Sequence, residues 1–418
     1  MQHTEASLWR HREFLKLWGG QSFSVFGSLI SRIALPFLLI YTLNATTGQI
    51  AWLRAAESAP GLLIALIAGV WIDRMRRRPI MIAADLLRIL LVGSIPLALW
   101  LGHLSLLQVF LVAIPLSVLT VCFDVAYEAY LPTLVGPEQI NTANARLAAG
   151  SSVAEIAGFG FGGALFQLFG GALTLALDAV SYLVSVVTLL WIRHPEPEPG
   201  PADGEHESFL KEAREGVHVL AIHPVLRPLS GIVGLNGLYG GAMNVIYVLF
   251  ISRTLLVPAG IQGVLYGLGG ISSLIGATLS AAVLRRLGMG RTLIVTEVIA
   301  LLAVTLVAVA HGPFWLVLPL LVAQQLIGDG ADTISLIQVT SLRQTLVPNA
   351  VLGRVNASWR VLCEVAVLVG TLLTGLLSNA FSLRTLFLLA IAVRVVGFVW
   401  LLASPLRHLQ QTELTVPE

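Results

Sequence analysis

The sequence predicts an all-α polytopic membrane protein with twelve transmembrane helices, arranged as two six-helix bundles. The mean hydropathy of +0.85 over 418 residues is higher than expected for a soluble chain, because such a chain must cover its surface with polar side chains. Long apolar runs separated by short polar breaks recur along the chain, and about 20 apolar residues suffice for a helix to cross the hydrocarbon. The two halves also match each other at a constant difference in residue number, the one that separates Thr133 from Thr345.

Each predicted span is one apolar run that ends at a polar or turn-forming break. The spans of the first half are residues 13–43, 49–72, 79–101, 105–131, 140–168 and 170–192. Those of the second half are residues 226–253, 261–285, 291–311, 314–342, 352–378 and 384–403. The first span is too long for the apolar region of a signal peptide, so we expect it to be retained.

The segment between the halves is predicted to be a cytoplasmic linker. The stretch "RHPEPEPGPADGEHES" alternates prolines with acids, a composition that stays extended and solvated. The stretch "SFLKEAREGVHVL" follows it and predicts an amphipathic helix on the membrane surface, with one apolar face made of Leu210, Ala213, Val217 and Leu220. The predicted domains are therefore residues 1–192, the linker 193–225 and residues 226–418.

The positions of Lys and Arg predict the orientation of the chain. Odd-numbered loops such as "NATTGQ", "GHLS" and "HGP" hold almost none of these residues. By the positive-inside rule, this places both termini in the cytoplasm. The N-terminus and the even-numbered loops hold nearly all of the Lys and Arg residues outside the spans, including Arg74, Arg76, Arg77, Arg78, Arg146, Arg193, Lys211, Arg214, Arg285, Arg286, Arg291, Arg343 and Arg354.

Several function classes are excluded by composition and motif content. Cys122 and Cys363 lie inside apolar runs, which leaves no disulfide framework and no thiolate metal site. A net charge of +2 provides no basic arm for nucleic acid. No HExxH, GxSxG or GxxxxGK[ST] motif occurs, so we expect neither an enzyme nor a bound cofactor.

The match between the two halves predicts an internal duplication of six plus six spans. Thr133, Leu134 and Val135 match Thr345, Leu346 and Val347, and further matches in the same register join glycines of the fifth and eleventh spans, Gly158 with Gly370 and Gly163 with Gly375. Two such halves that rock about a site at the midplane are an established transporter design.

The stretch "GVWIDRMRRRPIM" resembles the loop between the second and third spans of the major facilitator superfamily. Five residues of this stretch fit the family motif: Gly69, Asp73, Arg74, Arg77 and Arg78. The chain departs from the motif at position 76, where it has arginine and the family usually has glycine. The resemblance implies the major facilitator fold and a cytoplasmic gate that latches helices together. The alternative is a topology signal alone. On the third span, Asp85 and Arg88 stand at i and i+3 and are expected to pair and to join this gate network.

Four further stretches resemble the branch with bacterial macrolide-efflux and enterobactin or siderophore-export permeases: "FDVAYEAYLPTLV", "NARLAAGSSVAEIAGFGFGG", "LDAVSYLVS" and "SFLKEAREGVHVLAIHPVLR". The resemblance implies a drug:proton antiporter in the bacterial inner membrane. Two departures occur, Gly158-Phe159 in place of the exporters' Gly-Pro and Arg285 at the position that matches Asp73.

Ionisable residues within the spans are the candidates for coupling and substrate binding, because an ionised side chain at mid-membrane costs about 3 kcal/mol on insertion scales. Arg32 and Glu57 are expected at similar depth and form a possible ion pair. Asp124 and Glu128 stand one turn apart on the fourth span, so two like charges share a face, which suits proton coupling. Both lie toward the cytoplasmic end of the span, which favours a gating or structural role instead.

The deeper charges lie on the fifth, tenth and eleventh spans. We expect Glu155 and Asp332 to bind protons or cations, with Arg360 and Arg32 as counter-charges. The alternative is that each charge joins helices. Two more candidates complete the set. Asp329 lies at i−3 from Asp332, and Glu364 lies at i+4 from Arg360 and is expected to pair with it.

The glycines at 158, 162 and 163 are predicted to let helices approach closely rather than to take part in chemistry.

Taken together, the sequence predicts a secondary active transporter that exports a small amphipathic molecule and draws on the proton gradient. The expected partners are the substrate, protons and the bilayer, and the protein is expected to be monomeric. The alternatives are an importer or lipid permease of the same superfamily, or a membrane-embedded enzyme or receptor.

Overall fold

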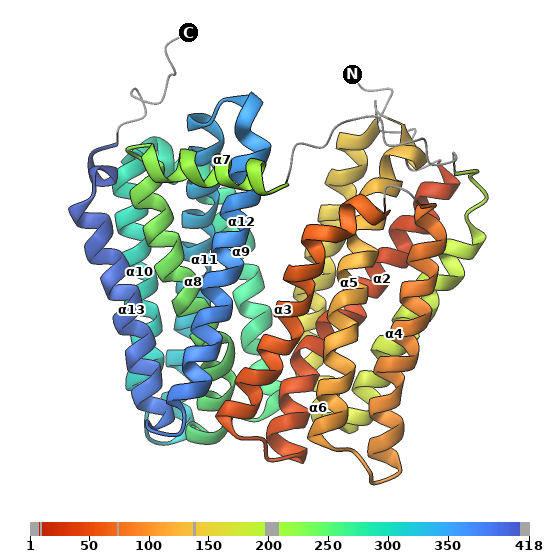
Figure 1. Cartoon of the computed structure of the whole chain (residues 1–418). Helices are drawn as coiled ribbons and strands as arrows, with labels where there is room; N and C mark the ends of the chain where they lie inside the picture. Colours follow the sequence, from red (N-terminus) through yellow and green to blue (C-terminus); the bar gives the residue numbers. More distant parts are fainter. Residues whose placement is uncertain (1–7, 9–10, 73–74, 137–138, 197–208, 410–418) are drawn as a thin grey trace. The chain divides into compact units, whose positions relative to one another are not determined.

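The computed structural model describes Leu8 and residues 11–72, 75–136, 139–196 and 209–409. Throughout these residues the chain forms helices and connecting segments, with no β-strand (Figure 1). The predicted all-α class is confirmed.

The helices of the first half follow the predicted spans closely. α2 (Arg12–Phe37) continues into the π-helical turn η1 (Leu38–Thr42). Then come α3 (Thr47–Ile72), α4 (Arg77–Trp100), α5 (Leu106–Val135) and α6 (Ile140–Trp191).

The long helix α6 consists of two spans joined at Gly170. Its 52 residues would extend about 78 Å at about 1.5 Å per residue, far beyond the about 30 Å of hydrocarbon. Gly170 has φ 73° and ψ 174°, a conformation open to glycine because it has no Cβ. The break lies at the first residue of the predicted sixth span.

The second half begins with α7 (Phe209–Ile222), followed by α8 (Leu226–Leu249) with the π-helical turn η3 (Phe250–Thr254). The remaining elements are α9 (Ala259–Leu287), α10 (Met289–Val309), α11 (Phe314–Leu346), α12 (Asn349–Leu377), α13 (Leu383–Ala403) and the short 3-10 helix η4 (Pro405–His408).

Ten helices of the described chain are long and apolar enough to cross a membrane. α6 is one of these ten and supplies two spans. α3 adds another with its 26 residues, so the helices agree with the twelve predicted spans.

The chain divides into two compact units, and each is described by itself. The first contains Met1–Thr46, Leu53–Gly204 and Pro258–Gly267, and the second contains Thr47–Trp52, Glu205–Val257 and Leu268–Glu418. The domain limits drawn after residues 192 and 225 stay a prediction.

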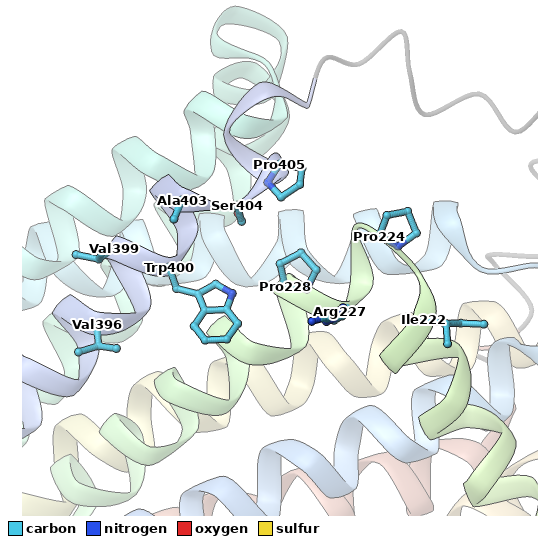
Figure 2. A pocket seen from close by; sticks show the side chains of 10 residues that line it. All are labelled: Ile222, Pro224, Arg227, Pro228, Val396, Val399, Trp400, Ala403, Ser404 and Pro405. Atoms are coloured by element: carbon cyan, nitrogen blue, oxygen red, sulfur yellow. The ribbon is translucent and has the colours of Figure 1, made fainter.

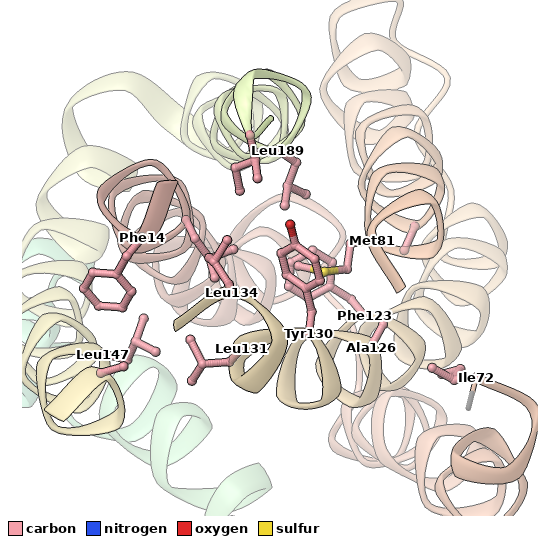
Figure 3. Packing of buried hydrophobic residues seen from close by; sticks show 14 of the residues in the cluster. Phe14, Ile72, Met81, Phe123, Ala126, Tyr130, Leu131, Leu134, Leu147 and Leu189 are labelled. Carbon is pink, nitrogen blue, oxygen red and sulfur yellow. The ribbon is translucent and has the colours of Figure 1, made fainter. Parts of the chain in front are cut away.

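An apolar cluster holds one end of the first unit together. Phe14 of α2 packs with Met81 of α4, Tyr130 and Leu134 of α5, and Leu189 of α6 (Figure 3). All five side chains are buried. The cluster therefore fixes the end of the unit at which α4 begins and α5 and α6 end.

The predicted duplication extends to the ends of helices. His11 accepts a hydrogen bond at Nδ1 from the Phe14 N–H at 3.1 Å, and His223 accepts one from the Leu226 N–H at 3.3 Å. The turns η1 and η3 start at positions that match in the register of the sequence repeat, as do the two non-glycine residues with positive φ, Asn44 and Leu256. The first and seventh spans thus end with the same backbone features, and a matching histidine accepts a hydrogen bond near the start of each.

The amphipathic helix α7 packs on α12 beside Gly216. A Cβ on Gly216 would lie 2.4 Å from the Arg354 carbonyl oxygen, and Glu215 forms an ion pair with Arg354. Leu220 is buried and Val217 is 56% exposed, and the predicted contact of the apolar face with the membrane surface stays a prediction. At Gly216 the backbones of the two helices approach closely. The side chains of Leu210 and Ala213 lie outside the described part.

Candidate functional site

A buried ion pair lies on α4 of the first unit. Asp85 and Arg88 are one turn apart, so the helix itself brings them together, and Arg88 Nη1 lies 2.9 Å from Asp85 Oδ1. The side chains are 0% and 4% exposed. The predicted pairing of these two residues is confirmed.

Neighbouring helices enclose the Arg88 guanidinium. Its Nη2 donates a hydrogen bond to the Leu119 carbonyl oxygen of α5 at 3.1 Å. It also lies 4.7 Å from the centre of the Phe123 ring and 5.3 Å from that of the Tyr182 ring. The cation is therefore held inside the unit by its own acid, a carbonyl and two aromatic faces.

A second buried acid, Asp178 of α6, lies in this unit and was missed by the sequence reasoning. It accepts hydrogen bonds at Oδ1 from Ser181 at 3.2 Å and from Ser28 of α2 at 3.4 Å. Ser28 also lies 2.9 Å from the Tyr182 hydroxyl. The stretch "LDAVSYLVS", used above only for resemblance, contained the signal, because its polar residues recur on one face of an apolar helix.

The second unit contains a cluster in which one arginine meets two acids. Arg394 of α13 donates from Nε to Glu297 Oε1 of α10 at 2.7 Å. Its Nη2 forms an ion pair with Asp332 of α11, and Nη1 lies 3.4 Å from Asp332 Oδ2. The guanidinium also lies 4.9 Å from the ring centre of Tyr239 on α8. We call Glu297, Asp332 and Arg394 the charge triad.

The members of the charge triad differ in exposure. The side chains of Arg394 and Glu297 are 4% and 6% exposed, and that of Asp332 is 48% exposed. Two carboxylates face one guanidinium, which leaves a formal charge of −1 when both acids are ionised. Because Arg394 also bonds the buried Glu297, loss of the contact with Asp332 would still leave the arginine paired with one acid.

The clusters of the two units occupy matching positions in the repeat. Asp85 matches Glu297 in the register that joins the two halves, and Tyr182 matches Arg394. The acid is therefore retained in both halves, whereas the cation comes from the acid's own helix in the first unit and from the last helix in the second.

The partners predicted for the charges need three corrections. Asp332 pairs with Arg394 rather than with Arg360 or Arg32. Glu57 pairs at 2.9 Å with Arg54, one turn earlier on α3, and not with Arg32. Similar depth was the only argument for Arg32, and a neighbour on the same helix is closer.

The third correction concerns α12. Arg360 and Glu364 are both exposed, and the described residues include no ion pair between them. Spacing of i and i+4 makes such a pair possible, but exposed side chains gain little from holding it.

The remaining candidate acids differ in their surroundings. Asp124, Glu128 and Glu155 are exposed, the first two on one face of α5 as predicted. Asp329 is half-buried and fills the space beside Gly269 of α9, where a Cβ would lie 2.1 Å from its Oδ2. The role of these four acids in proton coupling stays a prediction.

The loop motif contributes contacts between α4 and the end of α6. Asp73 and Arg74 lie outside the described residues, and Gly69 lies in the last turn of α3. Glu196 accepts hydrogen bonds from the Arg77 and Arg78 N–H groups at 2.5 and 3.1 Å. The Arg78 side chain donates to the carbonyl oxygens of residues 189 and 190 at 2.8 and 2.9 Å, groups that would otherwise be unsatisfied at the helix end. The gate role remains a prediction.

The predicted packing glycines lie at close approaches. A Cβ on Gly158 would lie 2.8 Å from Leu29 Cβ, and one on Gly162 would lie 3.4 Å from Ile30 Cα, both on α2. A Cβ on Gly163 would lie 2.3 Å from the Ala259 carbonyl oxygen in the same unit. Among the described residues, no group of three or more His, Cys, Asp or Glu side chains is placed to hold a metal ion.

The apolar helices, the repeat and the buried charges within the spans define a multi-pass transporter built from two halves. The model of the transmembrane secretion effector family matches residues 4–417. The chain belongs to this family, which is a branch of the major facilitator superfamily. It is a transporter, not an enzyme.

Relatives of this chain include exporters. The multidrug efflux pump Tap of Mycolicibacterium fortuitum is 29% identical over 394 residues, which cover 92% of this chain and 93% of Tap. The enterobactin exporter EntS of Escherichia coli is 29% identical over 70% of this chain and 68% of its own. An uncharacterized MFS-type transporter, y4rN of Sinorhizobium fredii, is 29% identical over 60% of this chain, and the match spans 62% of its length.

Solved structures share the fold. A bacterial homologue of the iron transporter ferroportin, in an inward-facing state, has a TM-score of 0.73 at 18% identity and covers 94% of this chain and 98% of its own. The nucleoside transporter NupG has a TM-score of 0.77 at 13% identity, over 94% and 98% of the two chains. At these identities the likeness shows the fold alone.

Proposed function

We propose that this protein exports a small amphipathic molecule by alternating access and takes up protons in exchange. The observation that carries the proposal is the charge triad, in which Arg394 lies between a buried acid and a half-exposed one. Asp332 is half-exposed and is paired with the buried Arg394. Such a carboxylate is suited to exchange its contact with the arginine for a proton or a substrate cation.

The triad supplies a physical route to coupling. With Asp332 ionised, both acids hold Arg394. When Asp332 binds a proton, that ion pair is lost, whereas the pair with Glu297 remains. A change of charge at one site shifts the balance between two conformations only if their interaction free energies with that site differ. Glu155 is the second proposed coupling acid, and the protein acts as a monomer without a bound cofactor.

The substrate class and the direction rest on the relatives. The names Tap, EntS and macrolide efflux protein A of Streptococcus pyogenes describe efflux of drugs, enterobactin and macrolides. We propose a drug, a macrolide or a siderophore as substrate, and the bacterial inner membrane with both termini in the cytoplasm as the setting.

The test is flux in proteoliposomes that contain the full chain. Labelled erythromycin, ethidium and enterobactin are the probes, and a pH gradient is imposed across the membrane. We expect the gradient to drive movement of at least one probe against its concentration, and a protonophore to abolish it. Absence of flux for all three probes, or flux that ignores the gradient, would overturn the proposal, and flux in the direction of uptake would favour an importer.

The Asp332→Asn substitution tests the coupling site. We expect flux to fall to the level without a pH gradient, because the amide cannot release or bind a proton at neutral pH. Asp332→Glu is the matched control, because it keeps a carboxylate and should keep gradient-driven flux. Equal pH dependence of wild type and Asp332→Asn would remove Asp332 from the coupling role.

A further inference from the structure

An open groove of about 680 Å³ lies on the second unit where α7 ends, α8 begins and α13 ends (Figure 2). One wall is the apolar face of α13, and the opposite wall is the start of α8. The side chains that matter here are Arg227, Pro228, Val396, Val399, Trp400 and Pro405.

The groove combines apolar walls with a single cation. Arg227 is the one charged residue among the described residues that line it. The Arg227 side chain is exposed, and within the described part of the chain it makes neither a hydrogen bond nor an ion pair. Val396 and Val399 are both more than half exposed, so α13 presents an uncovered apolar strip beside the cation.

The indole of Trp400 is fixed beside this cation by a glycine. A Cβ on Gly231, one turn after Arg227, would lie 3.1 Å from the Trp400 ring, so the ring rests on the backbone of α8. The nitrogen edge of the ring is turned toward Pro228 and Arg227 (Figure 2). An N–H donor and a guanidinium therefore face the same opening.

The groove lies at the ends of two membrane spans. α8 begins at Leu226 and α13 ends at Ala403, so Arg227 and Trp400 are within a turn of the level where hydrocarbon meets headgroups. At that level the available anion with an apolar tail is a phospholipid of the same leaflet.

We propose that this groove binds one anionic phospholipid, with its phosphate on Arg227 and the Trp400 N–H and an acyl chain along Val396 and Val399. Charge complementarity is the argument for an anionic lipid, because an exposed arginine gains most from a headgroup with a net negative charge. The site is separate from the charge triad and involves no transport step.

Native mass spectrometry of the full chain, released from detergent with added lipid, tests the site. Phosphatidylglycerol and phosphatidylcholine with the same acyl chains are the probes. We expect tight binding of one phosphatidylglycerol, and Arg227→Gln should weaken it about fivefold, the loss expected for one arginine near an anionic surface. Trp400→Leu should weaken it as well.

Arg286→Gln is the matched control, because Arg286 is an exposed arginine at the end of α9 and does not line the groove. It should leave binding unchanged. Equal binding of the two lipids to the wild type would mean an apolar surface without a headgroup site. Equal binding of phosphatidylglycerol to the wild type and Arg227→Gln would also overturn the proposal, and inorganic phosphate that displaces the lipid would support the phosphate contact.

Discussion

At the scale of single residues, the two acids of the charge triad differ in how they hold Arg394. Glu297 is buried and holds Arg394 by the 2.7 Å contact, whereas Asp332 is 48% exposed. An arginine inside a membrane span needs a partner, and the buried acid is the one that water cannot replace. We therefore propose that Glu297 is the structural member of the charge triad and that Asp332 is the exchangeable one.

Substitution of Glu297 by Gln should destabilise the protein more than Asp332→Asn does. Loss of the buried partner leaves Arg394 poorly compensated and should cost about 3 kcal/mol, the scale for breaking a buried pair. Asp332→Asn should cost about 1 kcal/mol or less, because a half-exposed pair is screened. Thermal unfolding in detergent micelles measures both, and equal losses would contradict the assignment.

At the scale of elements, a histidine accepts backbone hydrogen bonds at the start of the first membrane span of each half, α2 and α8. His223 Nδ1 accepts hydrogen bonds from the N–H groups of Val225 and Leu226 at 3.2 and 3.3 Å. Burial lowers the pKa of His223 below its usual 6.5, because desolvation disfavours the charged ring. A neutral ring is also what the cap requires, since a protonated Nδ1 cannot accept.

The cap of α8 should make stability depend on pH. The unfolded chain binds a proton at His223 more readily than the folded chain, so the contribution of this residue is present above pH 6.5 and is lost as the pH falls through the folded pKa. His223→Asn keeps a capping acceptor without titrating. We expect melting temperatures measured from pH 7.5 to 5 to fall more steeply for the wild type than for His223→Asn, and parallel curves would refute this.

At the scale of the whole molecule, the amino-acid sequence and the helices agree on twelve spans, and the sequence further predicts which side each loop faces. Membrane-impermeant maleimide applied to intact cells tests this on a chain with Cys122 and Cys363 replaced by Ala. His103→Cys, in an odd-numbered loop, should be labelled, whereas Met75→Cys, in an even-numbered loop, should react only after permeabilisation. Both side chains are exposed, so the reverse pattern would invert the orientation.

The sequence by itself determined the features that depend on one helix or one segment. The spans follow from the length of each apolar run, and the division of α6 follows from the predicted limit between residues 168 and 170. The Asp85–Arg88 pair follows from the rise and turn of a single helix. Each of these features depends only on residues within one helical turn or one apolar run, so the amino-acid order is enough to predict it.

The tertiary structure decided which residues from different helices meet. Arg394 lies 62 residues from Asp332 and 97 from Glu297, and no spacing rule connects them. Buried Asp178 likewise finds Ser28 across 150 residues. A shift of one residue turns a helix by about 100°, so the partner of a charge is set by how neighbouring helices rotate and pack, and this rotation is fixed only when the side chains of several helices fit together.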